Sequence, residues 1–250
     1  QDALYSVASG RLYRRLLSAP QIPPIMVGQL SVAVLDLAFD PVQERLYATT
    51  GADLYLISQV SAAAALVGAH GEQVVGITYD TAGDRLLAVE YFSEISQCDV
   101  STGVTTLLAR IDSGSGSLIA AHPSGAFAFA LSPTTGALDR VDLRSGARSR
   151  LSLTTAGLGA LTWDPSREQL LGFDPSSQAL VTIDPDTGVS ALVGVVNVVN
   201  ADIVALAFSG PSALFGIDRS SGQLLRISPE NGISQPLGNL GLQDPNGLVA

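Results

Sequence analysis

Short apolar runs separated by polar turns follow one another along the whole chain. One run, Leu37–Pro41 (LAFDP), returns as Ile77–Thr81 (ITYDT), Leu161–Pro165 (LTWDP) and Leu206–Gly210 (LAFSG), with a weaker copy at Ile119–Pro123 (IAAHP). Short β-branched and apolar runs bounded by Gly, Pro, Asp and Ser clusters are typical of β-strands joined by tight turns. The pattern therefore predicts an all-β chain built from a repeated unit.

The aspartate of the first run sets the register of the repeat. Counting from Asp40, the counterparts are Asp80, His122, Asp164 and Ser209, at steps of 40, 42, 42 and 45 residues. Each unit holds four apolar runs, and four antiparallel strands at this period are the blade of a β-propeller.

The segments between the third and fourth runs read as hairpin turns. They share a glycine at the position where a tight hairpin needs positive φ. They are Asp99–Gly103 (DVSTG), Asp142–Gly146 (DLRSG), Asp184–Gly188 (DPDTG) and Ser228–Gly232 (SPENG).

The repeat predicts one domain of six blades over residues 1–250. Five blades are continuous, at about 34–68, 74–109, 117–152, 159–194 and 203–238. The chain stops in the middle of a repeat, on Leu248–Ala250 (LVA). We therefore expect a composite sixth blade, with its inner strand from 246–250 and its other three strands from 3–28. Pairing of the N- and C-terminal segments would close the ring and leave no unmatched inner edge.

Composition limits the classes of partner. The chain is 46% hydrophobic and 14% charged, against about 25% charged residues in an average soluble domain, so we expect a large buried fraction. A net charge of −10 disfavours nucleic acid and anionic membrane surfaces, which both attract basic proteins. The longest apolar stretch, 191–208, is interrupted by Asn197, Asn200 and Asp202, which argues against membrane insertion. A protein or a small molecule remains as the partner.

Residues four positions before the reference aspartate should approach the propeller axis. They are Asp36, Gly76, Leu118, Ala160, Ala205 and Gly247. This level therefore offers one carboxylate, Asp36, in a small and apolar lining.

Two other features single out residues near the channel mouth. His70, in Ala69–Glu72 (AHGE), precedes an inner strand on the face where propellers bind ligands. The segment Glu90–Glu94 (EYFSE) breaks the repeat, with Tyr91 and Phe92 between two acids. Exposed aromatics are enriched at binding surfaces, while local packing over the neighbouring blade is the structural alternative. The predicted ligand- or partner-binding residues are Asp36, His70, Glu90, Tyr91, Phe92 and Glu94.

No nucleophile–base pair is evident. Cys98 aligns with Ile and Val of other blades, so we interpret it as a buried thiol. A nucleophilic role would need a nearby histidine, and His70 and His122 lie in other blades. His122 replaces the reference aspartate, so we assign it to a turn.

The repeat can be summarised as LAFDP, then Leu-Tyr-Ala/Gly, then Ile-Asp-Pro-x-Thr-Gly, then Leu-Val-Gly. This unit resembles repeats of bacterial secreted or cell-surface propellers, loosely the NHL, YVTN and quinoprotein-like superfamily. The resemblance covers the whole chain. It implies an extracytoplasmic location and binding at the channel face, and it implies no particular substrate.

Three functions are compatible with these observations. The first is a non-enzymatic binding or interaction propeller, secreted or part of an exported protein, for which no cofactor is expected. The second is a calcium-dependent hydrolase similar to lactonases and gluconolactonase, six-bladed enzymes that hold an axial Ca²⁺ with Glu, Asn and Asp. The third is a purely structural module of a surface protein. For the second, Asp36 could be joined by loop residues Glu90, Asn197, Asn200, Asp202, Asp218 or Asn246.

Overall fold

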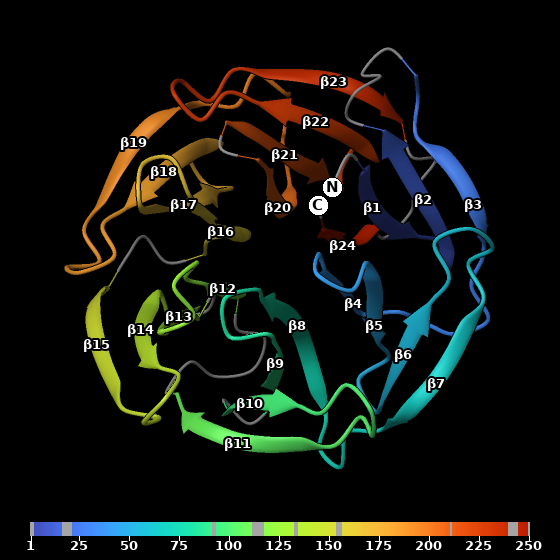
Figure 1. Ribbon diagram of the computed structural model, residues 1–250. Coiled ribbons are helices and arrows are strands. Elements are labelled where there is room, and N and C mark those ends of the chain that lie inside the picture. The colour runs from blue at the N-terminus through green and yellow to red at the C-terminus, as the bar shows by residue number, and fades with distance from the viewer. Residues whose placement is uncertain are drawn as a thin grey trace.

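A computed structural model of the chain consists of strands and turns arranged in six sheets around an axis (Figure 1). It describes residues 3–16, 22–91, 94–111, 118–132, 135–153, 157–210, 212–239 and 245–249, with the backbone alone at 152–153 and 245–249. Each sheet has four antiparallel strands, and the described residues contain no helix. The predicted all-β, six-bladed propeller is confirmed.

The blades are numbered here from the one that holds the N-terminus, and strands are given from the axis outward. Blade 1 is β24 (Pro245–Val249), β1 (Ala3–Ala8), β2 (Arg11–Leu16) and β3 (Ile25–Gln29); blade 2 is β4 (Asp36–Asp40), β5 (Arg45–Thr49), β6 (Asp53–Ile57) and β7 (Ala64–Ala69); blade 3 is β8 (Val74–Asp80), β9 (Arg85–Glu90), β10 (Glu94–Cys98) and β11 (Thr105–Arg110). Blade 4 is β12 (Leu118–Ala121), β13 (Phe127–Leu131), β14 (Ala137–Asp142) and β15 (Arg148–Leu153); blade 5 is β16 (Ala160–Asp164), β17 (Gln169–Asp174), β18 (Ala179–Ile183) and β19 (Ser190–Val195); blade 6 is β20 (Ile203–Ser209), β21 (Ala213–Asp218), β22 (Gln223–Ile227) and β23 (Ser234–Asn239).

The ring closes through the two ends of the chain. Strand β24 pairs antiparallel with β1, with Ser6 opposite Leu248 and Val7 opposite Asn246. Both strands lie together near the axis in Figure 1. The composite blade expected from the interrupted last repeat is therefore present.

The hydrophobic core lies between the blades. Each of six apolar clusters combines residues of two neighbouring blades. Strand β5 shows why: Leu46 and Ala48 pack toward blade 1, while Tyr47 between them packs toward blade 3. Successive side chains of a strand point to opposite faces. Because both faces are covered, these strands read as continuous apolar runs.

The predicted hairpin turns have the expected chemistry. In the turn that starts at Asp184, the Oδ1 atom accepts hydrogen bonds from the backbone N–H groups of Asp186 (3.1 Å) and Thr187 (2.7 Å). Gly188 ends the turn at φ 75°, a conformation that glycine adopts without steric cost. The corresponding Gly103, Gly146 and Gly232 also have positive φ. Within the described residues no helix is long and apolar enough to cross a membrane.

Candidate ligand channel

The inner strands surround a channel on the axis. Its cavity has a volume of about 840 Å³ and is lined by β4, β8, β12, β16 and β20. Pro41, Pro123 and Pro165, which follow three of these strands, line one end. Leu35 and Arg219 belong to the other end, where the inner strands begin. We call this end the mouth.

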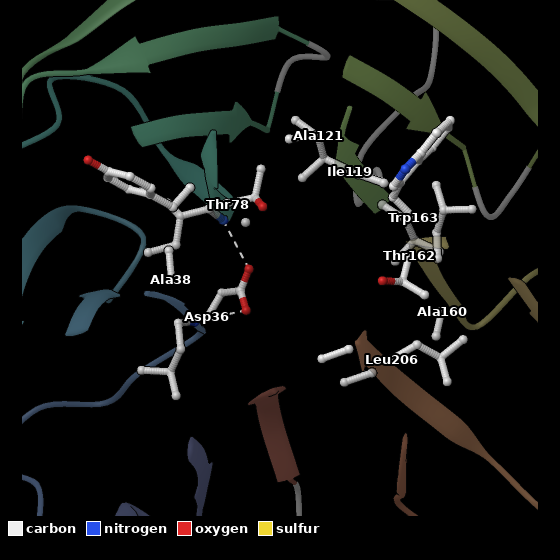
Figure 2. A pocket seen from close by; sticks show the side chains of 18 of the residues that line it. Asp36, Ala38, Thr78, Ile119, Ala121, Ala160, Thr162, Trp163 and Leu206 are labelled. Atoms are coloured by element: carbon white, nitrogen blue, oxygen red, sulfur yellow. Dashed lines mark hydrogen bonds between the residues drawn. The ribbon is translucent and has the colours of Figure 1, made fainter. Parts of the chain in front are cut away.

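The structure places five of the six predicted axial residues in the channel wall: Asp36, Gly76, Leu118, Ala160 and Ala205. The sixth, Gly247, belongs to β24, for which only the backbone is described. The wall at this level is small and apolar except for one carboxylate. Figure 2 shows the Asp36 side chain directed into the lumen.

Backbone donors hold the Asp36 carboxylate in place. Its Oδ1 accepts a hydrogen bond from the N–H of Leu37, and its Oδ2 accepts one from the N–H of Ile77 in the next blade, each at 2.9 Å (Figure 2). A Cβ added at the facing Gly76 would lie 3.4 Å from Oδ2, so the neighbouring wall adjoins the carboxylate closely. Burial in the wall raises the Asp36 pKa to about 6, against the opposing effect of the two N–H donors.

Two threonine hydroxyls add to the polar surface of the channel. Thr78 and Thr162 line the cavity two residues after the level of Asp36, on β8 and β16. Both are labelled in Figure 2 at the edge of the lumen. Neither hydroxyl has a hydrogen-bond partner among the described residues. Neither threonine was predicted to line the channel, although the two-residue alternation of a strand, applied to Asp36, indicates this level as well.

Aromatic rings flank the channel but turn away from it. Trp163 stacks on Phe129, with ring centroids 5.8 Å apart, and meets the edge of His122 at 4.4 Å. Figure 2 shows the Trp163 ring pointing away from the lumen. Phe39 stacks on Tyr5 of blade 1. These rings therefore pack between blades rather than forming a platform in the channel.

The candidate calcium ligands are not gathered around Asp36. At the mouth, Asp202 Oδ2 forms an ion pair with Arg219, at 2.8 Å from Nη2 and 2.9 Å from Nε. Glu90 is the last residue of β9 and is buried, and Asn200 is exposed in a loop. The side chain of Asn246 lies outside the described residues.

The side-chain oxygen atoms of two further candidate ligands already accept hydrogen bonds. Asn197 Oδ1 accepts hydrogen bonds from the backbone and hydroxyl of Ser234. Asp218 accepts from the N–H of Asp202 and from the hydroxyl groups of Ser220 and Ser221. In the described part of the chain, no group of three or more His, Cys, Asp and Glu residues is placed to hold a metal ion. Of the candidate ligands whose side chains are described, Asp36 alone lines the channel.

His70 is buried between blades 2 and 3, away from the channel wall. Its Nδ1 lies 3.0 Å from the carbonyl of Gly103, which can only accept, so Nδ1 carries the proton. Its Nε2 then accepts from the Thr49 hydroxyl, also at 3.0 Å. Desolvation lowers the His70 pKa. His70 does lie in the loop between β7 and β8, but its side chain is buried and does not line the channel.

Blade packing brings the only cysteine to His70. Cys98 Sγ lies 3.8 Å from His70 Nδ1 and 3.3 Å from the Gly103 carbonyl. The two residues belong to different blades, as the sequence indicated, but those blades are neighbours. The contact between Cys98 and His70 could therefore not be read from the repeat alone. Burial raises the Cys98 pKa to about 12, so the thiol stays protonated. This matches a buried thiol and not a nucleophile.

The segment Glu90–Glu94 is only partly a loop. Glu90 ends β9 and is buried, while Glu94 begins β10 and pairs with Arg110 at 3.0 Å. Tyr91 is 45% exposed, and Phe92 lies outside the described residues. Tyr91 N–H donates to the carbonyl of Gln73, which precedes an inner strand, so Tyr91 belongs to the mouth face.

Comparisons with known proteins identify the fold. No protein-family model matches the chain, and no curated protein matches it in sequence. Similar solved structures include a chain of the nidogen/laminin complex, with a TM-score of 0.82, 14% identity, and coverage of 99% of this chain and 97% of that one. Virginiamycin B lyase from Staphylococcus aureus is also similar, with a TM-score of 0.67, 13% identity, and coverage of 98% and 88%. The likeness shows a shared β-propeller fold, which among these neighbours belongs to a protein complex and to a lyase.

Proposed function

We propose that this protein is a non-enzymatic binding propeller that takes a small molecule in its axial channel. The observation that carries this proposal is the channel itself, with a volume of about 840 Å³. Most of the side chains that line it are apolar, and its polar or charged side chains include Asp36, Thr78, Thr81, Thr162 and Arg219. A concave, mostly apolar cavity with a small number of placed polar groups is typical of ligand sites.

The absence of enzymatic activity is part of the proposal. The thiol–imidazole contact of Cys98 and His70 is buried outside the channel. The raised pKa of the Cys98 thiol and the proton on His70 Nδ1 leave neither group prepared for nucleophilic attack. A nucleophile has to be activated by an adjacent base or by a lowered pKa, and this pair offers neither.

A channel-filling variant tests the proposal. Thr162→Phe puts an aromatic ring into the lumen, whereas Thr106→Phe puts the same ring on the exposed outer strand β11. In a ligand-observed NMR fragment screen, we expect fragments that bind the natural protein to lose about tenfold or more in affinity for Thr162→Phe. Affinity for Thr106→Phe should be unchanged. Fragments that bind all three proteins equally, or a channel that takes no fragment, would contradict the proposal.

A protein partner at the mouth face is the second candidate. Leu35, Tyr91 and Val199, which are 43%, 45% and 85% exposed, follow or precede strands at this end of the blades. Exposed apolar and aromatic side chains on one face mark interaction surfaces. The fragment screen separates the two candidates, because docking on the rim needs no occupant in the channel.

An extracytoplasmic location is also part of the proposal. It is supported by the resemblance of the repeat unit to those of secreted propellers. Fractionation of the source cells, followed with an antibody against this chain, tests it. Recovery of the protein in the cytoplasmic fraction alone would refute it.

A further inference from the structure

The channel holds a carboxylate without a counter-ion. Asp36 and Arg219 are the charged residues of the lining, and Arg219 is paired with Asp202 at the mouth. Asp36 has no ion pair among the described residues; its protein partners are the N–H groups of Leu37 and Ile77. One hydrogen bond to each oxygen leaves lone pairs free on both, because a carboxylate oxygen accepts more than one.

The protein environment favours a positive charge beside Asp36. A carboxylate in an apolar wall loses hydration, and a neighbouring cation restores stabilisation to its charged form. The raised pKa of Asp36 is consistent with such unrelieved desolvation. The net charge of −10 adds a long-range field that attracts cations and repels anions.

The oxygen atoms and the side chains that line the channel limit the chemical class of its ligand. A metal ion would need further oxygen ligands, and among the described residues of the channel lining Asp36 has no second carboxylate beside it. A carbohydrate would usually stack on aromatic rings, but the four aromatic residues of the lining all pack against clusters between blades. They are Phe39, Tyr79, Trp163 and Phe208. Leu118, Ala205 and Ala207, which line the channel and are partly exposed, instead offer small apolar contacts. These suit the hydrocarbon part of an organic ligand.

We propose that the axial channel binds an organic cation, a protonated amine with a compact apolar body. Its ammonium group donates hydrogen bonds to the free lone pairs of the Asp36 carboxylate. Its body lies against the alanine and leucine side chains, within reach of the hydroxyl groups of Thr78 and Thr162. This inference rests on the proposed function and names its ligand class.

Matched probes test the charge requirement. We would titrate phenethylamine and its neutral analogue phenethyl alcohol at millimolar concentrations. The readout is the methyl NMR signals of Ala38, Thr78, Ala160 and Thr162, all of which line the channel. We expect the amine to shift these signals with at least about tenfold higher affinity than the alcohol, as for a charge-assisted hydrogen bond.

Two variants test whether Asp36 causes the preference for the amine over the alcohol. Asp36→Asn should lower the affinity for the amine by about tenfold or more and leave the affinity for the alcohol unchanged. Asp186→Asn removes an equal charge from an exposed position on the rim, where Asp186 pairs with Arg140, and should leave both probes unchanged. Thermal unfolding would establish that both variants are folded.

The pH dependence provides an independent check. Because the Asp36 pKa is about 6, the amine should bind about tenfold more weakly at pH 5 than at pH 7.5, while its own ammonium stays protonated. Equal affinities for amine and alcohol, both unaffected by Asp36→Asn, would overturn the cation inference and leave the channel as a ligand site. An amine that shifts no channel signal would also overturn it. A failed fragment screen with the channel-filling variant would instead overturn the proposed function.

Discussion

At the scale of single residues, the interface between blades 2 and 3 departs from the repeat. Thr49, His70 and Cys98 form a buried hydrogen-bonded group. Arg15 of blade 1 is the counterpart of Cys98. The other corresponding positions are apolar. They are Val89, Leu131, Phe173 and Ile217 for Thr49, Leu30 and Val196 for His70, and Ile57, Val141 and Ile183 for Cys98.

These buried polar groups form hydrogen bonds with one another and with nearby backbone groups. Thr49 Oγ1 accepts from the N–H of Gly51 and donates to His70, which donates in turn to the Gly103 carbonyl. We expect His70→Leu to cost about 1–3 kcal/mol, because it leaves buried polar groups without partners. Thr49→Val/His70→Leu should cost less than the sum of the single variants by about 1 kcal/mol. Urea unfolding of the natural protein and the three variants measures this coupling, and strict additivity would contradict it.

The same residue predicts a pH effect. A histidine with a lowered pKa in the folded state binds its proton more weakly there than in the unfolded chain. Its contribution to stability is therefore complete above about pH 6.5 and is lost as the pH falls below that value. Desolvation is the largest cause of the lowered His70 pKa, and the hydrogen bond to Gly103 and the charges of Asp53 and Glu90 oppose it. The stability difference between the natural protein and His70→Leu should thus shrink from pH 7.5 to pH 5. A constant difference would show that His70 does not titrate in this way.

At the scale of elements, glycines let neighbouring blades approach through their outer strands. Gly68 in β7 faces the hairpin of blade 3, where an added Cβ would lie 1.8 Å from the carbonyl oxygen of Thr102. Gly194 in β19 stands in the same relation to Asn231 of blade 6, at 1.9 Å. The Leu-Val-Gly motif of the repeat is therefore an interface motif, with no room for a side chain.

We expect Gly68→Ala to destabilise the fold by about 2 kcal/mol or more, because the obstructing atoms are backbone and cannot rotate away. Gly76→Ala is the matched control, since its Cβ would meet Asp36 Oδ2 at an ordinary 3.4 Å. That variant should stay within about 1 kcal/mol of the natural protein. Denaturant unfolding compares the two, and equal effects would refute the interface role of Gly68.

At the scale of the whole molecule, stability depends on closing the ring. Strand β24 pairs with β1 and also packs against β4 and β20 of the adjoining blades. Without it, β1 would be an unpaired inner edge, and open edges invite association with other chains.

Removal of residues 245–250 should therefore lower the unfolding temperature by about 10 °C or more and promote oligomers. Adding a peptide of residues 245–250 should reverse both effects, because β1 still offers the edge with which β24 pairs. Differential scanning calorimetry and gel filtration provide the measurements. A truncated protein that melts like the full chain and stays monomeric would contradict this role of β24.

The blades, their number and the residues that face the axis could be predicted from the amino-acid sequence alone. These features follow from local rules: the repeat period, the turn residues and the two-residue alternation of strands, which together indicated Asp36 and its small neighbours as lining the axis. They also indicated that the last repeat is completed by the first thirty residues.

The contacts across blade boundaries, in contrast, are seen in the folded structure and could not be predicted. The hydrogen bond from Ile77 to Asp36, the contact of His70 with Cys98, and the approach of Gly68 to Thr102 each join two blades. The burial of Glu90 and the pairing of Asp202 with Arg219 were equally unpredicted. The physical reason is that such contacts depend on how twisted sheets pack against one another around the axis. Strand spacing along the chain carries no information about that packing.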